Sequence, residues 1–226
     1  MTRFNTPMTK LLSLSLSLSL TACSLTADVT NEGSGLPRKA SLSVPFTVQA
    51  PHANWDAPYQ EACEEAALLM VHSFLSESEL TSQRANEQLL DLIEWETKKG
   101  YSEDVTLQEL ADIAEFFYGY TSQIIEDPSL RGIQEQIAQG NPVIVPAAGR
   151  MLGNPYFSGE GPWYHMLVIT GYDGRRFITN DPGTKRGEGY RYKHDVLLDA
   201  IHDWTRVKEE ISEGERRVLI LNKGTF

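Results

Sequence analysis

Cysteine is nearly absent from this chain, and so is any long uninterrupted hydrophobic run. The 226 residues include only two cysteines, Cys23 and Cys63, too few for a disulfide framework or a cysteine zinc site. Basic residues are also scarce, since 20 Lys and Arg stand against 31 Asp and Glu, a formal net charge of −11. Nucleic acid is bound through clustered positive charge, so this balance argues against a nucleic-acid-binding protein. The sequence has neither metal-ligand spacing of the HExxH type nor a phosphate-cradling glycine loop, and we expect no metal and no cofactor.

The composition is that of an ordinary folded protein. Hydrophobic residues make up 41% of the chain and charged residues 23%, which excludes a disordered, collagen-like or coiled-coil protein. A chain of this length can build one core, so a single domain is the simplest expectation.

The N-terminal residues 1–22 are predicted to be a lipoprotein signal peptide. Arg3 and Lys10 give a positive start, Leu11 to Leu20 alternates Leu with Ser, and small residues follow. This order is typical of a secretory signal, and the apolar run is shorter than the about 20 residues that span a bilayer. Leu20-Thr21-Ala22-Cys23 resembles the bacterial lipobox. The resemblance implies that mature protein starts at lipidated Cys23 and is held on the extracytoplasmic side of the cell membrane; a plain secretory signal cleaved nearby is the alternative.

The rest of the chain is predicted to be a tether followed by one α+β domain. Residues 23–41 are rich in Ser, Thr, Asn and Gly, which is typical of a flexible linker, and the domain is expected over 42–226. A short strand is expected at 44–48, and then three helices at about 59–75, 81–98 and 106–119. The second half alternates strands (121–125, 143–147, 163–172, 176–180, 217–222) with helices (129–138, 195–204). Helices followed by a mostly antiparallel sheet predict the α+β class.

Cys63 is the first candidate for a catalytic residue. It is expected in the first turn of a helix, where free backbone N–H groups and the helix dipole favour the nucleophilic thiolate. The neighbouring Glu64 and Glu65 oppose this slightly, because nearby negative charge raises a thiol pKa. The alternative is a buried core cysteine, since the helix carries an apolar stripe.

A thiol nucleophile needs a base, and the base needs an acceptor that orients it. His165 begins the strongest predicted strand after a glycine-rich loop, which favours a position at a cleft edge. A tight turn at Asp173-Gly174 would bring Asp181 beside the start of that strand. The alternatives are a satisfied core histidine and an ordinary turn aspartate.

These motifs together resemble the C39-like cysteine peptidases, a part of the papain-like group. The resemblance spans about residues 42–192 and rests on an ordered set of motifs: Val44-Pro45-Phe46 with Gln49, Cys63-Glu64-Glu65-Ala66, Asn141-Pro142-Val143-Ile144-Val145, His165 through Gly171-Tyr172, and Asn180-Asp181-Pro182-Gly183. It implies a papain-like fold with N-terminal helices packed on a mostly antiparallel sheet. The chain departs from many relatives at Glu64, where they have Gly.

The resemblance also implies roles for individual residues. Cys63 would be the nucleophile, His165 the general base and acid, and Asp181 the group that orients the imidazole. Gln49 would donate to the oxyanion beside the Cys63 backbone N–H, with Gln60 as a rival for that role. Trp55, Tyr156 and Trp163 either line a substrate groove or simply pack.

The expected function is therefore that of a lipid-anchored extracytoplasmic thiol hydrolase, most simply a peptidase acting on a peptide or protein. Within enzymes, the alternative is a cell-wall amidohydrolase of the NlpC/P60 type, a family that favours Asp-Cys-Ser at the nucleophile and a second His as the orienting group. Outside enzymes, the alternative is a binding lipoprotein on an inactive peptidase scaffold.

Overall fold

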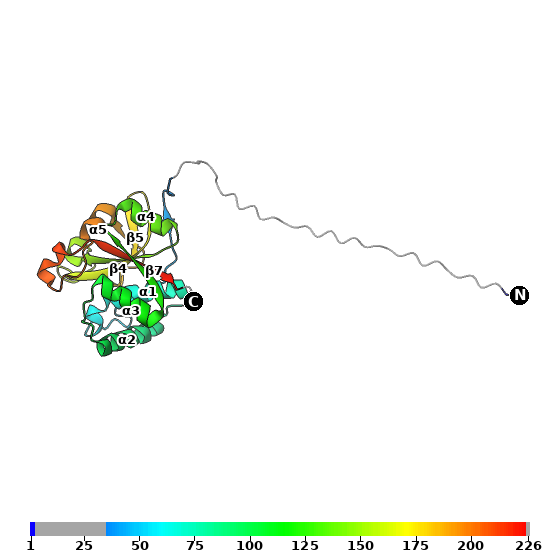
Figure 1. The fold of residues 1–226 in the computed structure, drawn as a ribbon, viewed down its shortest axis with the longest axis horizontal. Coiled ribbons are helices and arrows are strands. Elements are labelled where there is room, and N and C mark those ends of the chain that lie inside the picture. Colours follow the sequence, from blue (N-terminus) through cyan, green and yellow to red (C-terminus); the bar gives the residue numbers. More distant parts are fainter. Residues whose placement is uncertain (3–34, 225–226) are drawn as a thin grey trace. The chain divides into compact units, whose positions relative to one another are not determined.

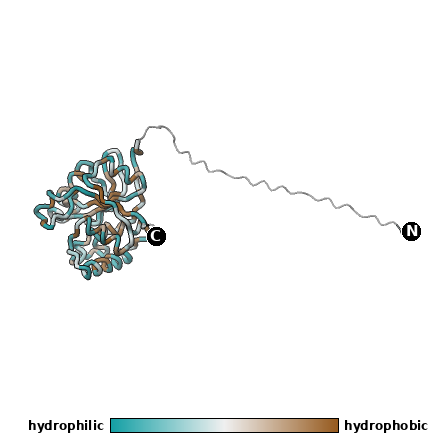
Figure 2. The backbone as a smooth tube through the Cα atoms, viewed as in Figure 1, coloured by the Kyte–Doolittle hydropathy of each residue, from teal (hydrophilic) through white to brown (hydrophobic). Residues whose placement is uncertain are grey.

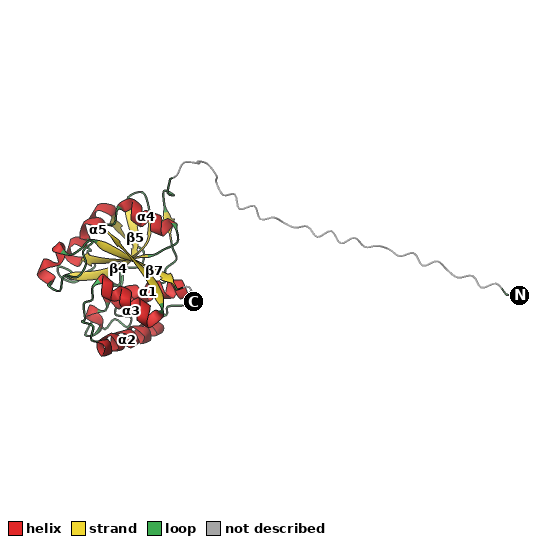
Figure 3. Cartoon of the chain, in the orientation of Figure 1, coloured by secondary structure: helices red, strands yellow, loops and turns green. Residues whose placement is uncertain are grey.

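A seven-stranded antiparallel sheet lies at the centre of this computed structural model, which describes residues 1, 2 and 35–224 (Figure 3). The strand order is β2-β7-β3-β4-β5-β6, and the short β1 pairs with the end of β4. The strands are β1 (Ala40–Ser41), β2 (Tyr120–Glu126), β3 (Val143–Ala148), β4 (Tyr164–Tyr172), β5 (Arg176–Asn180), β6 (Tyr190–Lys193) and β7 (Arg217–Lys223). Cys23, the predicted signal peptide from residue 3 onward and most of the predicted tether lie outside the described residues.

Helices cover both faces of this sheet (Figure 1). One face packs against α1 (Cys63–Ser76) and α3 (Leu107–Tyr118), and α2 (Ser82–Lys99) packs on α1. The other face packs against α4 (Leu130–Ala138) and α5 (His194–Ala200). Three 3₁₀ turns complete the elements: η1 (Tyr59–Glu61), η2 (Gly149–Leu152) and η3 (Lys208–Glu213).

The strand β4 explains why both faces are covered. All nine of its residues are buried, and side chains along a strand alternate between faces. Met166 and Val168 join the core under α1 and α3, whereas Leu167 and Ile169 join the core under α4 and α5. The hydrophobic segments accordingly gather along the sheet in Figure 2. A strand buried on both faces is a rigid support for a residue near its start, which is where His165 lies.

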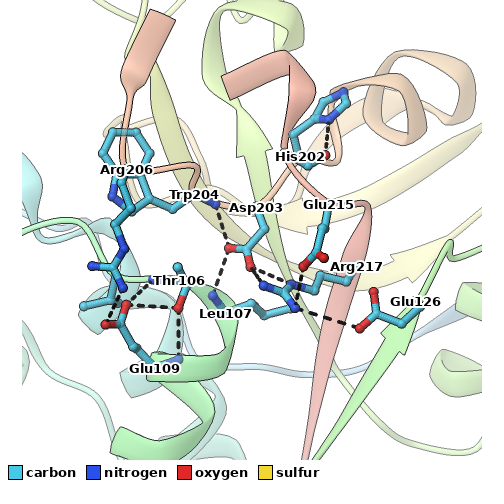
Figure 4. Close-up of polar contacts among 12 residues, drawn as sticks. Thr106, Leu107, Glu109, Glu126, His202, Asp203, Trp204, Arg206, Glu215 and Arg217 are labelled. Atoms are coloured by element: carbon cyan, nitrogen blue, oxygen red, sulfur yellow. Dashed lines mark hydrogen bonds and ion pairs between the residues drawn. The ribbon is translucent and has the colours of Figure 1, made fainter. Parts of the chain in front are cut away.

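Asp203 connects the helical layer to the sheet (Figure 4). Its Oδ1 accepts hydrogen bonds from the backbone N–H groups of Leu107 at 2.9 Å and Trp204 at 2.7 Å, and its Oδ2 pairs with the Arg217 guanidinium at 2.6 Å. The carboxylate is 1% exposed, so each of these partners offsets part of the cost of burying its charge. This contact fixes the start of α3, which also carries the predicted capping box of Thr106 and Glu109.

Several segments differ from the sequence-based prediction. No strand forms at 44–48, because Pro45 has no N–H for a ladder, and the Val44 carbonyl accepts from the Asn180 side chain instead. The helix predicted over 195–204 ends at Ala200, since Ile201 pairs with Ala147 of β3. The strands β1 and β6 were not predicted.

The folded part of the chain begins earlier than residue 42. The Tyr172 hydroxyl donates to the Pro37 carbonyl at 2.9 Å, and residues 40–41 form β1. The last residues of the predicted tether therefore belong to the domain. Among the described residues, no helix combines the length and apolar character needed to cross a membrane.

Candidate active site

A cavity of about 600 Å³ brings together residues that are far apart in the sequence. Cys63 reaches it from the first turn of α1, His165 from the start of β4, and Gln49 from the loop before η1. The sequence-predicted nucleophile, base and oxyanion donor thus line one cavity, and Gln60 lines it as well.

The predicted base, His165, and the predicted orienting carboxylate, Asp181, are in direct contact. His165 Nε2 lies 2.8 Å from Asp181 Oδ1, and the side chains are 1% and 0% exposed. The antiparallel register of β4 and β5 causes this contact: Val168 faces Asn180, so Asp181 leaves β5 beside the start of β4. This is the adjacency expected from the tight turn after β4. Because Asp181 holds Nε2, Nδ1 is the ring nitrogen left for another partner.

Sequence reasoning missed two members of this network, Asn154 and Tyr192. Asp181 Oδ2 accepts from the Tyr192 hydroxyl at 2.6 Å and from Asn154 Nδ2 at 3.1 Å, while Oδ1 also accepts from the Gly183 N–H at 3.0 Å. Burial alone would raise the pKa of Asp181, but the His165 ring and these hydrogen bonds outweigh it, so the pKa is lowered. The carboxylate therefore stays ionised although it is fully buried.

Glycine is required at two places around this pair. A side chain on Gly183 would place its Cβ 2.8 Å from His165 Cε1, and one on Gly187 would collide with the Asp181 carbonyl. The edge of the imidazole and the backbone of the carboxylate are thus closely enclosed. The Phe157 ring meets the His165 ring edge-on at 5.2 Å between centroids. These contacts hold the imidazole in one orientation.

The surroundings of Cys63 favour the neutral thiol. Burial raises its pKa most, and Glu64 adds to the rise because the thiol donates to Glu64 Oε2 at 2.9 Å. A hydrogen bond from the backbone of Met166, the residue after His165, lowers the thiol pKa in part. Glu64 opposes ionisation of the Cys63 thiol more strongly than its position in the sequence suggests. Its side chain turns inward, is 0% exposed and also accepts a hydrogen bond from the Val105 N–H at 3.3 Å.

The Gln49 side chain was predicted to donate to an oxyanion, but in the structure it donates to two backbone carbonyls. Its Nε2 donates to the carbonyls of Tyr59 at 3.0 Å and Gln60 at 2.8 Å, so both of its hydrogens are engaged. Since both acceptors are carbonyls, the orientation of the amide group is fixed by chemistry. In this arrangement Gln49 anchors the turn that leads into Cys63. The backbone N–H of Cys63, at the start of α1 where Ala62 supplies no side-chain cap, is available as a donor.

Aromatic side chains form much of the cavity wall. Trp55, Trp163 and Trp204 line it, while Tyr156 lies in a neighbouring depression with Trp55. The Arg150 guanidinium stacks on the Trp163 ring at 3.5 Å from its centroid. Two of the three aromatic residues singled out in the sequence therefore face the cavity.

Comparison with solved structures identifies the fold. A Bacillus anthracis protein assigned to the C39-like peptidases superposes with a TM-score of 0.56 at 14% identity, covering 84% of this chain and 100% of the other. Xylellain, a cysteine protease from Xylella fastidiosa, gives a TM-score of 0.43 at 13% identity, covering 85% of this chain and 88% of its own. The predicted fold is confirmed: this is an α+β protein of the papain-like type.

The sequence itself places the chain within that class. Residues 41–212 match the profile of the Peptidase_C39 like family. The chain belongs to this family, as the ordered motifs predicted. No curated protein matches the sequence.

Proposed function

We propose that this protein is an extracytoplasmic, lipid-anchored cysteine peptidase with Cys63 as its nucleophile. The observation that carries the proposal is the buried His165–Asp181 pair at a cavity that Cys63 also lines. The family match supports a peptidase and favours it over an NlpC/P60-type amidohydrolase. The substrate is a peptide or protein.

The reaction would use the three groups in sequence. His165 Nδ1 takes the proton of the Cys63 thiol, and the sulfur attacks the peptide carbonyl carbon to form a tetrahedral oxyanion. The imidazolium then gives its proton to the leaving amine, and a thioester remains on Cys63. Water, deprotonated by the same imidazole, hydrolyses the thioester and restores the thiol. Asp181 stabilises the imidazolium that forms in each half of the cycle.

The thiol must leave Glu64 for this sequence to begin. The Cys63 side chain would have to turn so that its sulfur exchanges the Glu64 carboxylate for the imidazole as its hydrogen-bond partner. The Cys63 backbone N–H would donate to the oxyanion. Gln49 would join it only by releasing one of its two carbonyl partners, and Gln60 remains the rival donor.

The anchor is supported by the sequence alone. The lipobox-like Leu20-Thr21-Ala22-Cys23 follows a basic start and a short apolar run. With a net charge of −11, the protein has no electrostatic attraction to an anionic bilayer surface. A lipid on Cys23, together with the polar residues after it, would hold the domain at the membrane.

A peptide library tests the proposed activity. Wild type should cleave some of its members, and Cys63→Ala should cleave none of them. Gln49→Ala and Gln60→Ala separate the two oxyanion candidates, because loss of a true donor slows turnover by roughly 10²-fold. Cleavage of the same peptides by Cys63→Ala would refute the proposal.

The non-catalytic scaffold is a second candidate because of one observation. Burial and the Glu64 contact hold Cys63 as a neutral thiol. If that state persisted with peptide bound, the cavity would bind peptides without cleaving them. Peptide binding by wild type with no hydrolysis of any library member would favour this alternative.

A further inference from the structure

A second cavity, of about 170 Å³, adjoins the one that holds Cys63. The two cavities share Gln60, Glu61 and Glu103 in their linings, so the smaller is a side pocket of the larger. Its inner wall carries two further glutamates, Glu65 from α1 and Glu96 from α2. Four glutamates therefore line one small pocket next to the candidate nucleophile.

The two inner glutamates are buried and incompletely bonded. Glu65 and Glu96 are each 5% exposed and hydrogen-bond to each other, and apart from that contact Glu65 Oε2 and Glu96 Oε1 have no hydrogen-bond partner among residues 35–224. Buried carboxyl groups without donors are costly, and a proton or a cation is needed to offset that cost. Burial and the facing carboxylate of Glu65 raise the pKa of Glu96 to about 11, and burial raises that of Glu65 to about 7. At neutral pH the pair thus shares a proton.

The groups around this pair add negative rather than positive charge. Apart from the phenol of Tyr101 and the ammonium of Lys208, the titratable groups facing the pocket and its rim are Glu61, Glu64, Glu103 and Asp104. Burial and the repulsion from Asp104 and Glu103 raise the pKa of Glu61, and the single Lys208 offsets little of this. The pocket therefore has an excess of carboxylates and no internal cation to match them.

We propose that this side pocket binds the ammonium or guanidinium group of a lysine or arginine side chain of the peptide substrate. The inference rests on the proposed function, because it assigns the pocket to the substrate of Cys63. A bound cation would pair with the ionised Glu65 and would donate a hydrogen bond to Glu96, which keeps its proton. Glu61 and Glu103 lie at the junction with the larger cavity, and their negative charge would attract the ligand cation toward the side pocket.

The size and walls of the pocket fit an organic cation. One water occupies roughly 30 Å³ of liquid, so a cavity of about 170 Å³ takes on the order of five heavy atoms, the length of a lysine side chain. Pro58, Ile93 and Tyr101 also line it and supply apolar contact for methylene groups. Within the described part of the chain, no three His, Cys, Asp or Glu side chains converge as metal ligands would. An organic cation therefore fits this pocket better than a bare metal ion.

Cation binding should be linked to the release of one proton. Glu65, with a pKa of about 7, is the group that must become fully ionised to pair with the ligand. Affinity should therefore rise about tenfold per pH unit below pH 7 and level off above it. A surface carboxylate, which is already ionised at pH 5.5, would produce no such rise.

Matched peptides test the pocket through catalysis. Lysine and norleucine, which differ in the terminal ammonium, are exchanged at each position of a cleaved peptide, and kcat and KM are measured separately. At one position, wild type should prefer lysine by at least about tenfold in KM, and Glu65→Gln should lose this preference while still cleaving the norleucine peptide. Glu94→Gln is the matched control, because it removes the same charge from the solvent-exposed side of α2. No lysine preference at any position in wild type would overturn the proposal.

A binding measurement tests the pocket without catalysis. Cys63→Ala full-length protein is titrated with n-butylammonium and with n-butanol, from pH 5.5 to pH 8, by calorimetry or NMR. We expect saturable binding of the ammonium alone, tightening with pH, and weakened at least tenfold in Glu65→Gln or, should that variant not fold, in Glu96→Gln. Ammonium binding without cleavage of any peptide would refute the peptidase and leave the pocket standing. Equal binding of both probes, or binding of Ca²⁺ but not of the ammonium, would overturn the pocket even if the enzyme is active.

Discussion

Replacing Glu64 with glutamine should make Cys63 react faster with alkylating agents at neutral pH. The thiol donates to Glu64 Oε2 at 2.9 Å, and both side chains are buried. Burial and the charge of Glu65 raise the pKa of Glu64, so the thiol and the carboxyl titrate as a coupled pair. Removing the last proton from this pair brings a thiolate next to a carboxylate. Glutamine cannot ionise, and its amide can donate a hydrogen bond to the thiolate.

The expected gain follows from the separation of the two charges. At 2.9 Å, in a medium of effective dielectric near 20, two like charges repel by roughly 4 to 6 kcal/mol. Taking the lower figure, the thiolate population rises by about three powers of ten at any pH at which Glu64 of wild type is ionised. A less basic thiolate is also a weaker nucleophile, which halves the effect on the logarithm of the rate. The alkylation rate should therefore rise roughly 30-fold.

The assay is the rate of iodoacetamide alkylation at Cys63 between pH 6 and pH 9, followed by mass spectrometry. Cys63→Ala gives the background from any other site, and Glu94→Gln controls for loss of an exposed acid. An unchanged rate would show that Glu64 does not face the ionising thiol. A slower rate would show that Glu64 assists thiol ionisation, which is the opposite of the effect expected from two like charges in contact.

Four further outcomes are expected. Asp181→Asn should cut peptide turnover by roughly 10²-fold or more and should also slow Cys63 alkylation near neutral pH, because it removes the charge that stabilises the imidazolium formed when His165 takes the thiol proton; unchanged rates would contradict this. Cys23→Ser should abolish fatty-acid labelling in a bacterial host, and labelling equal to wild type would refute the anchor. Stability should fall as pH rises from about 4.5 to about 7, because the raised pKa values of Glu65, Glu64 and Glu96 bind protons more tightly in the folded state, and thermal unfolding of Glu65→Gln should show a shallower fall than wild type. Asp203→Ala should lower the free energy of unfolding by about 3 kcal/mol in urea denaturation, since it removes the buried carboxylate that binds Arg217 and the backbone N–H groups of Leu107 and Trp204, and a loss below about 1 kcal/mol would contradict a structural role for that contact.

The fold could be predicted from sequence where local signals were strong. The capping box of Thr106 and Glu109 and the glycine after each of α2 and α3 marked the ends of helices correctly. The Asp173-Gly174 turn fixed the pairing of β4 with β5 and hence the contact of His165 with Asp181. Edge strands carry weaker signals: β1 has two residues, and β6 alternates tyrosine with charged residues, so neither was predicted.

The site was predictable only in part, because its finer contacts depend on side-chain directions. Sequence spacing placed Glu64 next to Cys63 but did not show that the carboxylate turns inward to meet the thiol. The bonds of Asn154 and Tyr192 to Asp181 join segments that no local pattern connects. The same holds for Gln49, whose amide is engaged by carbonyls ten and eleven residues further along the chain.

The central claim is that Cys63 is a nucleophile activated by His165. Covalent labelling by a thiol-reactive peptide electrophile, with the modified residue mapped by mass spectrometry, tests it most directly. Wild type should be labelled at Cys63 at neutral pH, Cys63→Ala should not be labelled, and His165→Ala should be labelled appreciably only as pH rises toward the ordinary thiol range of about 8.5 and beyond. Labelling of His165→Ala at the wild-type rate across the whole pH range would contradict activation of the thiol by His165.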